Sequence, residues 1–281
     1  MMETAESDSA LGYGKPPWIF KGSALYQLHL VKAETARAFI PKEFKLVEVF
    51  GYTLGGFFLA NYEDSPAGIF DELVVIAGIA WNPPTSCAWA ARVLVSSDKA
   101  CVHGRKDFGL PSQVANFTKS VKAVSGTKKS RYGGFLSKIG MENMQNSIDI
   151  QVKEMSNHTA MDICSINLTG SAMAATRKWM GPAVKISLPS FSGRTEYNPH
   201  LLKYSCQIEC RLRAVAPAKV LGPSMLNIDN ETISEMDFSS GDSCDYKRNL
   251  SISMMLSKPI LALELSCLKM KVEAPTAVVP R

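Results

Sequence analysis

The sequence predicts a mainly β protein of the α+β class, in which a bent antiparallel sheet closes into a barrel-like fold with one or two short helices. About a dozen stretches of the 281-residue chain alternate between apolar and polar residues, as half-buried strands do. Turn residues separate these stretches at intervals of about 8–15 residues, which is typical of closed or doubled sheets. Glycines inside several stretches favour the bulges and curvature that closure requires.

The two ends of the chain are expected to lie outside the domain. Residues 1–12 carry Glu3, Glu6 and Asp8 among small residues and are expected to form a disordered tail. Residues 13–272 are expected to form a single domain, followed by a loose tail over 273–281. The acidic first residues do not resemble a transit peptide, so the expected location is the cytoplasm. No apolar run approaches the ~20 residues that a transmembrane helix needs.

The first half of the chain predicts strands around one short helix. Residues 33–39 read as that helix, which Pro41 ends because proline cannot continue it. Gly51, Gly55 and Gly56 are expected to bend the neighbouring strands. The strands are expected over residues 23–31, 44–50, 52–62, 73–80 and 88–96.

A second helix, from Asp98 to Phe108, ends at a well-marked corner. Gly109 can adopt the left-handed conformation that closes a helix, and Pro111 then forces an extended exit. Two polar residues, Ser112 and Gln113, follow at once. A fixed corner with a polar pair beside apolar residues can be a simple connection or can hold a reactive group.

The second half predicts strands only. The clearest of them, 204–213, places Cys206, Ile208 and Cys210 on one face and charged or amide side chains on the other. Residues 250–256 and 260–272 read as the last two strands. The others are expected over 114–124, 143–155, 160–168 and 184–188.

Composition excludes several function classes. The net charge of +5 is modest, and the densest basic cluster, Lys128-Lys129-Ser130-Arg131, has no interleaved aromatic residues, so no nucleic-acid partner is expected. Seven scattered cysteines and four distant histidines lack metal-ligand spacing, so no metal is expected. No phosphate-binding or nucleophile motif is present, and no cofactor is expected.

Three short motifs resemble the acetoacetate decarboxylase family. The first is Gly104-Arg105 followed by the Pro111-Ser112-Gln113 corner. The second is the loop Tyr62 to Glu72, and the third is Trp179-Met180-Gly181-Pro182. The resemblance covers about residues 18–222 and implies a bent sheet closed around a cavity. Residues 223–272 are then a C-terminal β extension.

The resemblance also implies a cavity that has lost the chemistry of the family. Where the family has two lysines, one of which forms a Schiff base, this chain has Ser112 and Gln113, and neither can form an imine. Glu72 matches a family glutamate that faces the cavity, whereas Phe58 stands where a second glutamate is expected. A pocket that has become partly apolar suits a hydrophobic ligand. The candidate ligand-binding residues are Phe58, Glu72, Arg105, Ser112, Gln113 and Trp179.

The run from Gly12-Tyr13-Gly14-Lys15-Pro16-Pro17-Trp18 to Gln113-Val114-Ala115 is followed by a chain that includes the C-terminal extension. On this run and over the whole chain, the sequence resembles a plant family required for making the xanthophyll neoxanthin, upstream of abscisic acid. This implies an accessory factor that binds a hydrophobic molecule such as a xanthophyll, with carotenoid-pathway proteins or a second copy of the chain as potential partners. A direct role in that pathway favours the plastid. Two alternatives stay open: an enzyme that uses Glu72 as acid or base on an epoxide or keto substrate, and a decarboxylase that uses a displaced Lys106 or Lys119.

Overall fold

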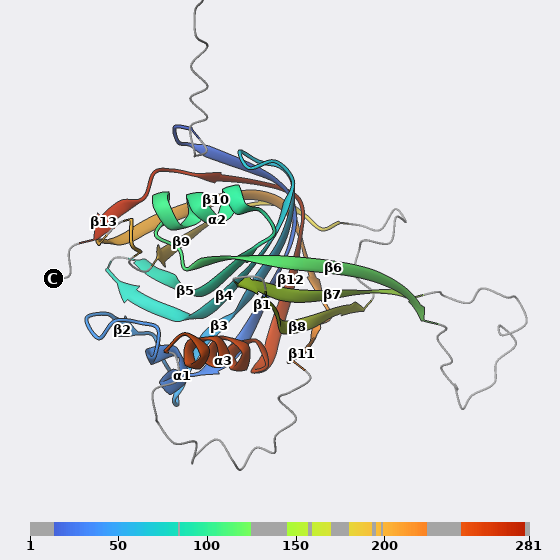
Figure 1. Cartoon of the computed structure of the whole chain (residues 1–281), viewed down its shortest axis with the longest axis horizontal. Coiled ribbons are helices and arrows are strands. Elements are labelled where there is room, and N and C mark those ends of the chain that lie inside the picture. The colour runs from blue at the N-terminus through green and yellow to red at the C-terminus, as the bar shows by residue number, and fades with distance from the viewer. Residues whose placement is uncertain are drawn as a thin grey trace, which may run out of the picture.

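The computed structural model describes residues 14–83, 85–124, 145–156, 159–169, 180–192, 195–197, 199–223 and 243–278. The predicted mainly β fold is confirmed: 13 strands form one continuous sheet, accompanied in this part of the chain by three short helices (Figure 1). Most neighbouring strands are antiparallel, and β5 (Thr85–Val95) supplies the parallel pairings.

Seven strands close into a barrel. Their order around the ring is β5–β9–β10–β12–β1–β3–β4, and the pairing of β4 with β5 completes the circle. Register shifts bend β1, β4 and β10, and those in β1 and β4 adjoin Gly22 and Gly78. The pairing of β3 with β1 is unbroken at Gly55 and Gly56, where the sequence predicts bending. The seven strands are β1 (Trp18–Lys32), β3 (Tyr52–Asp64), β4 (Phe70–Asn82), β5 (Thr85–Val95), β9 (Ala183–Ser192), β10 (Leu201–Val215) and β12 (Lys258–Val272).

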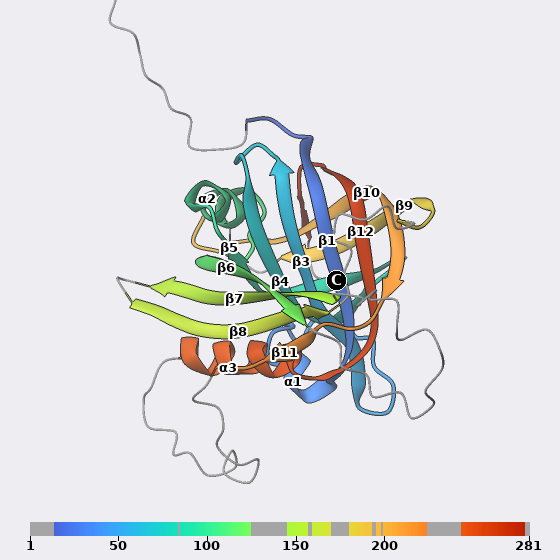
Figure 2. The same cartoon turned by 90° about the vertical axis from the view of Figure 1, so that its right-hand side faces the viewer.

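A second layer of strands branches from the barrel at β5. Residues Val93–Val95 of β5 pair in parallel with the start of β6, and β6, β7, β8 and β11 continue as an antiparallel sheet (Figure 2). Two very short strands, β2 and β13, pair with β4 and β10. The bounds are β2 (Lys45–Leu46), β6 (Ser112–Val124), β7 (Gln145–Ser156), β8 (Thr159–Thr169), β11 (Lys219–Leu221) and β13 (Thr276–Val278).

The two helices predicted in the first half are present. Helix α1 spans Ala33–Arg37, and α2 spans Asp98–Asp107. The Ser97 hydroxyl accepts a hydrogen bond from the Ala100 amide and caps the start of α2. Gly109, with φ of 67°, follows the end of α2 in the left-handed conformation that the sequence predicts.

The prediction of a strand over residues 250–256 is wrong. This segment belongs to helix α3, Ser243–Met255, which packs below the second sheet in Figure 2. The run Ser251-Ile252-Ser253-Met254 imitates strand alternation, but Ile252, Met254 and Met255 are all buried against the outer side of the barrel. Tertiary packing therefore overrides the local pattern. Beyond α3, β12 lies between β1 and β10, so the expected extension supplies an interior strand of the ring.

Two apolar cores lie on opposite faces of the barrel wall. On β4, Leu73 and Val75 point outward and pack with the second sheet, α1 and α3. Phe58 and Phe70 belong to the other core, inside the ring, together with residues of α2. Because side chains alternate across a strand, Glu72 and Val74 face the interior. The interior core is incomplete, and the space left in it is the candidate site.

Candidate functional site

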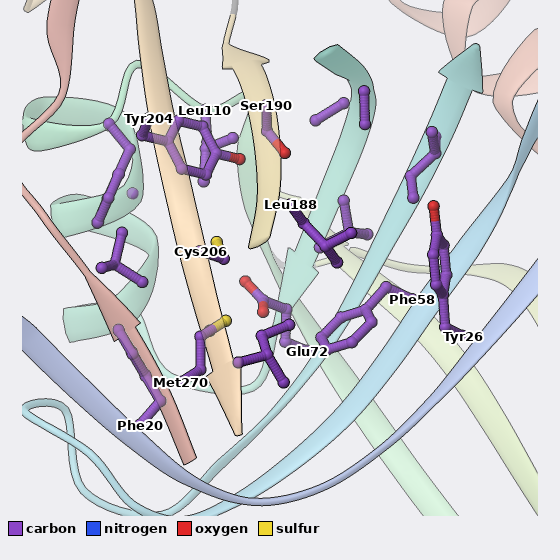
Figure 3. Close-up of a pocket in the computed structure, with 18 of the residues that line it drawn as sticks. Phe20, Tyr26, Phe58, Glu72, Leu110, Leu188, Ser190, Tyr204, Cys206 and Met270 are labelled. Atoms are coloured by element: carbon purple, nitrogen blue, oxygen red, sulfur yellow. The ribbon is translucent and has the colours of Figure 1, made fainter. Parts of the chain in front are cut away.

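A cavity of about 230 Å³ lies inside the barrel, between the barrel wall and α2 (Figure 3). Its lining comes from β1, β3, β4, β5, α2, β9, β10 and β12, so all seven strands of the ring contribute. The lining is dominated by aromatic and aliphatic side chains. Its aromatic members are Phe20, Tyr26, Phe58, Tyr62, Phe70, Phe108 and Tyr204.

Glu72 is the one carboxylate of this lining, and no lysine or arginine accompanies it among the described lining residues. The Tyr62 hydroxyl donates a hydrogen bond of 2.9 Å to Glu72 Oε2. Burial raises the pKa of Glu72 to about 7, because the apolar surroundings disfavour the charged form; the Tyr62 hydrogen bond opposes this shift. Near neutral pH a large share of the Glu72 side chains therefore carries a proton and can donate a hydrogen bond.

This shift predicts a pH-dependent stability. The folded-state pKa of Glu72 lies above the ordinary value of 4.5, so its contribution is fully present below about pH 4.5 and is lost as the pH rises to about 7. The change amounts to at most about 3 kcal/mol at 1.36 kcal/mol per pKa unit. Thermal unfolding between pH 4.5 and 8.5 should show wild-type stability falling relative to Glu72→Gln. If the stabilities of the two proteins changed equally with pH, the raised pKa of Glu72 would be contradicted.

The other polar groups of the lining are held neutral. Burial raises the pKa of the Cys206 thiol to about 12, with the Glu72 carboxylate adding to the shift, so Cys206 is a poor nucleophile. Burial also raises the pKa of Tyr204 well above 10, although a hydrogen bond with Ser190 opposes this. The pKa of His103 falls to about 3 through burial and the nearby Lys99 and Lys106. The cavity thus offers uncharged hydrogen-bonding groups on an apolar wall.

The structure brings together two of the residues proposed from the sequence. Phe58 and Glu72 both line the cavity, whereas Ser112, Gln113 and Arg105 are not part of its lining. Ser112 is buried against α2, where a Cβ placed on Gly104 would lie 2.5 Å from its Oγ. Gln113 Oε1 is also buried and has no hydrogen-bond partner among the described residues.

Arg105 turns toward the surface of the molecule. Its Nε and Nη2 donate to Glu196 Oε1 at 3.0 and 2.7 Å, and its Nη1 donates to the Ser112 carbonyl oxygen at 3.3 Å. Arg105 therefore ties the end of α2 to the first residue of β6 and to the segment between β9 and β10. Trp179, the remaining residue proposed from the sequence, lies outside the described residues.

The tyrosines and Cys206 of the lining were not predicted as site residues. Tyr26 and Phe58 are cross-strand partners in β1 and β3, and both face the interior. The alternation of β10 places Cys206 on one face with Ile208, and both residues line the cavity. The alternation of β1 predicts which residues share a face with Tyr26. Which of the two faces points inward is set only when the strands close into the barrel.

Neither displaced lysine reaches the cavity. Lys119 Nζ pairs with Asp71 Oδ1 at 2.6 Å, and Asp71 neighbours Glu72 on the opposite face of β4. Lys106 is exposed on α2. The described part of the chain thus places no amine beside Glu72.

The described residues contain neither a metal-binding cluster nor a membrane-spanning helix. Within the described ranges, no three histidine, cysteine, aspartate or glutamate side chains are grouped so that they could hold a metal ion. No helix among the described residues is long and apolar enough to cross a membrane.

Solved structures with this architecture define its class. The chain aligns with the enduracididine biosynthesis enzyme MppR complexed with pyruvate, with a TM-score of 0.54 at 13% identity over 98% of this chain and 94% of that one. It aligns with an acetoacetate decarboxylase at a TM-score of 0.53 and 8% identity, over 99% and 95% of the two chains. The ring of bent strands around an internal cavity is therefore an acetoacetate decarboxylase-like fold.

Sequence comparison gives the particular family, although no protein-family model matches the chain. The chain is 64% identical to Protein NEOXANTHIN-DEFICIENT 1 of Solanum lycopersicum, over 99% of this chain and 97% of the relative. It is 58% identical to the protein of the same name from Arabidopsis thaliana, over 99% of each chain, and 53% identical to the one from Oryza sativa subsp. japonica, over 98% and 93%. The chain belongs to the NEOXANTHIN-DEFICIENT 1 family.

Proposed function

We propose that this protein is an accessory factor in neoxanthin synthesis, and hence in abscisic acid synthesis, and that it binds a hydrophobic molecule inside the barrel without Schiff-base chemistry. The role in neoxanthin synthesis comes from the names of its relatives. The binding of an apolar ligand comes from the cavity, whose described lining is aromatic and aliphatic around one protonatable carboxylate and contains no lysine. The composition of this lining is the observation that carries the proposal.

The cavity also limits the kind of ligand. Its volume of about 230 Å³ lies below the range of roughly 300–1,000 Å³ that is usual for drug-sized ligands. A small ring or one end of a longer isoprenoid is therefore the expected guest. Glu72 in its protonated form, with Tyr62 and Tyr204, would hydrogen-bond a hydroxyl, epoxide or keto oxygen on that ring.

Pigment binding tests the proposal directly. Purified protein should shift the visible absorption of violaxanthin or neoxanthin at micromolar concentration. Glu72→Leu should weaken binding about tenfold, because a polar oxygen of the ligand then loses its buried partner. Glu72→Gln, which keeps a hydrogen-bonding group, should retain most of the affinity. An unshifted spectrum with both pigments and with their cyclic end-group fragments would contradict the proposal.

Schiff-base chemistry is expected to be absent. Incubation with acetoacetate or pyruvate and sodium borohydride should leave the mass of the protein unchanged, because no described amine reaches the cavity. An acetoacetate decarboxylase treated in parallel provides the positive control. A trapped adduct on Lys106 or Lys119 would restore the decarboxylase alternative.

A further inference from the structure

The hairpin between β2 and β3 presents an aromatic side chain in an unusual way. Val49 and Tyr52 close the turn through two backbone hydrogen bonds of 2.9 and 3.0 Å. The central residues, Phe50 and Gly51, have φ of 50° and 78°. Such turns favour asparagine or glycine at both positions, and a bulky residue there is strained. Phe50 is nevertheless 97% exposed, so no packing within the described chain offsets this strain.

Strain that folding does not explain indicates a contact outside the chain. Phe50 is not isolated, because other apolar side chains around this hairpin are 41–63% exposed. In Figure 1 the β2 hairpin projects from the same side of the molecule as the end of β4. Together these side chains form the surface that we call the hairpin patch: Val47, Val49, Phe50, Tyr52, Leu54 and Trp81.

The hairpin patch continues into the barrel interior. Leu54 and Tyr52 lie on the same face of β3 as the cavity residue Phe58, since the register with β1 is unbroken over this stretch. Trp81 lies two residues after Ile79 on β4 and pairs with Ser86 of β5. Ile79 and Ser86 both line the cavity. The exposed apolar surface thus borders the cavity wall.

Basic residues surround the hairpin patch. Lys32 pairs with Tyr52, and Lys45 pairs with Trp81 across neighbouring strands. The exposed Lys42 and Lys258 lie at the same end of the barrel, next to β2 and at the start of β12. The nearby acids are fewer: Glu34 and Glu43, together with Glu48, which already pairs with Arg37 at 3.0 Å.

We propose that the hairpin patch docks on the surface of a membrane that contains anionic lipids, with Phe50 and Val49 inserted among the acyl chains. Tryptophan and tyrosine favour the interface between headgroups and acyl chains, and lysines contact anionic headgroups. A narrow hairpin tip suits insertion into lipid better than it suits a flat protein partner. Docking would place the wall of the cavity against the bilayer, so that an apolar ligand could enter without crossing water; this second step rests on the proposed function.

Vesicle co-sedimentation of the full chain, without pigment, tests docking apart from the proposed function. Wild-type protein should sediment with vesicles of phosphatidylcholine mixed with phosphatidylglycerol, and more weakly with phosphatidylcholine alone or at high salt. Phe50→Gly should reduce partitioning at least about tenfold, because the inserted ring is lost. The same variant should melt at a higher temperature than wild type, because glycine relieves the strained turn. A purely structural role for Phe50 predicts lower stability instead.

The matched control is Ile69→Ser, which removes an apolar side chain that is 77% exposed elsewhere on the molecule. Its partitioning should equal that of wild type. Wild-type protein that stays in the supernatant with both vesicle types would overturn the proposal, as would equal losses in Phe50→Gly and Ile69→Ser. A concentration-dependent dimer that Phe50→Gly abolishes, with no vesicle binding, would assign the hairpin patch to self-association instead.

Discussion

Replacing Glu154 by alanine is expected to lower the free energy of unfolding by about 3–5 kcal/mol, a large part of the stability of an ordinary domain. Glu154 belongs to β7, and its side chain is 4% exposed. Its Oε2 accepts hydrogen bonds from Arg92 of β5 and, at 3.2 Å, from Arg248 Nε of α3. The alanine variant would leave two guanidinium groups at this site, 7% and 13% exposed, without their shared carboxylate.

Asp245, the other acidic partner of Arg248, provides a control for the loss of Glu154. Arg248 also pairs with Asp245, but that carboxylate is 62% exposed. Asp245→Ala should therefore cost less than about 1 kcal/mol, as exposed ion pairs usually do. Chemical denaturation of wild type and the two variants measures both effects. Equal losses of stability in Glu154→Ala and Asp245→Ala would contradict the proposed role of the buried Glu154 carboxylate.

Glu154 joins the second sheet, the barrel and α3. Its loss should therefore also weaken the docking of α3, and faster hydrogen exchange in α3 would detect this.

The sequence could predict features that depend on neighbours along the chain. The helix over residues 98–107 was predictable because Gly109 and Pro111 mark its end locally. The alternation in β10 correctly separated Ile208 and Cys210 from the exposed Gln207 and Glu209. Glu72 was predicted to face the cavity because it matches a glutamate of the family that the Tyr62–Glu72 loop resembles, and it lines the cavity.

Features that depend on distant partners could not be predicted. Helix α3 has the alternation of a strand, and its conformation depends on contacts with the barrel and on the pairing of Arg248 with Glu154, 94 residues away. The corner residues Ser112 and Gln113 were expected at the cavity because the motif around them resembles the acetoacetate decarboxylase family. Even so, the packing of Ser112 behind Gly104 keeps it off the cavity lining. A motif specifies a position along the chain, whereas the direction of a short side chain depends on what packs around it.

Filling the cavity should abolish pigment binding. Ala88 lies in the middle of β5, pairs with Ile79 and Ser190, and lines the cavity. In Ala88→Phe the phenyl ring would occupy space that the ligand needs, and the affinity should fall at least about 100-fold, equivalent to about 2.7 kcal/mol. The fold should survive, because the added ring enters an existing hollow and not a filled core, where overpacking usually costs about 1–3 kcal/mol.

Titration of violaxanthin into wild type and Ala88→Phe measures this effect, with Ala277→Phe in the exposed strand β13 as the matched control. The control adds the same ring outside the cavity and should bind pigment like wild type. Vesicle binding should be unchanged in both variants, because neither alters the hairpin patch. Undiminished pigment binding in Ala88→Phe, with the variant folded by circular dichroism, would place the ligand elsewhere. Ala88→Phe thus separates a cavity that holds the ligand from a membrane-facing surface that only adsorbs it.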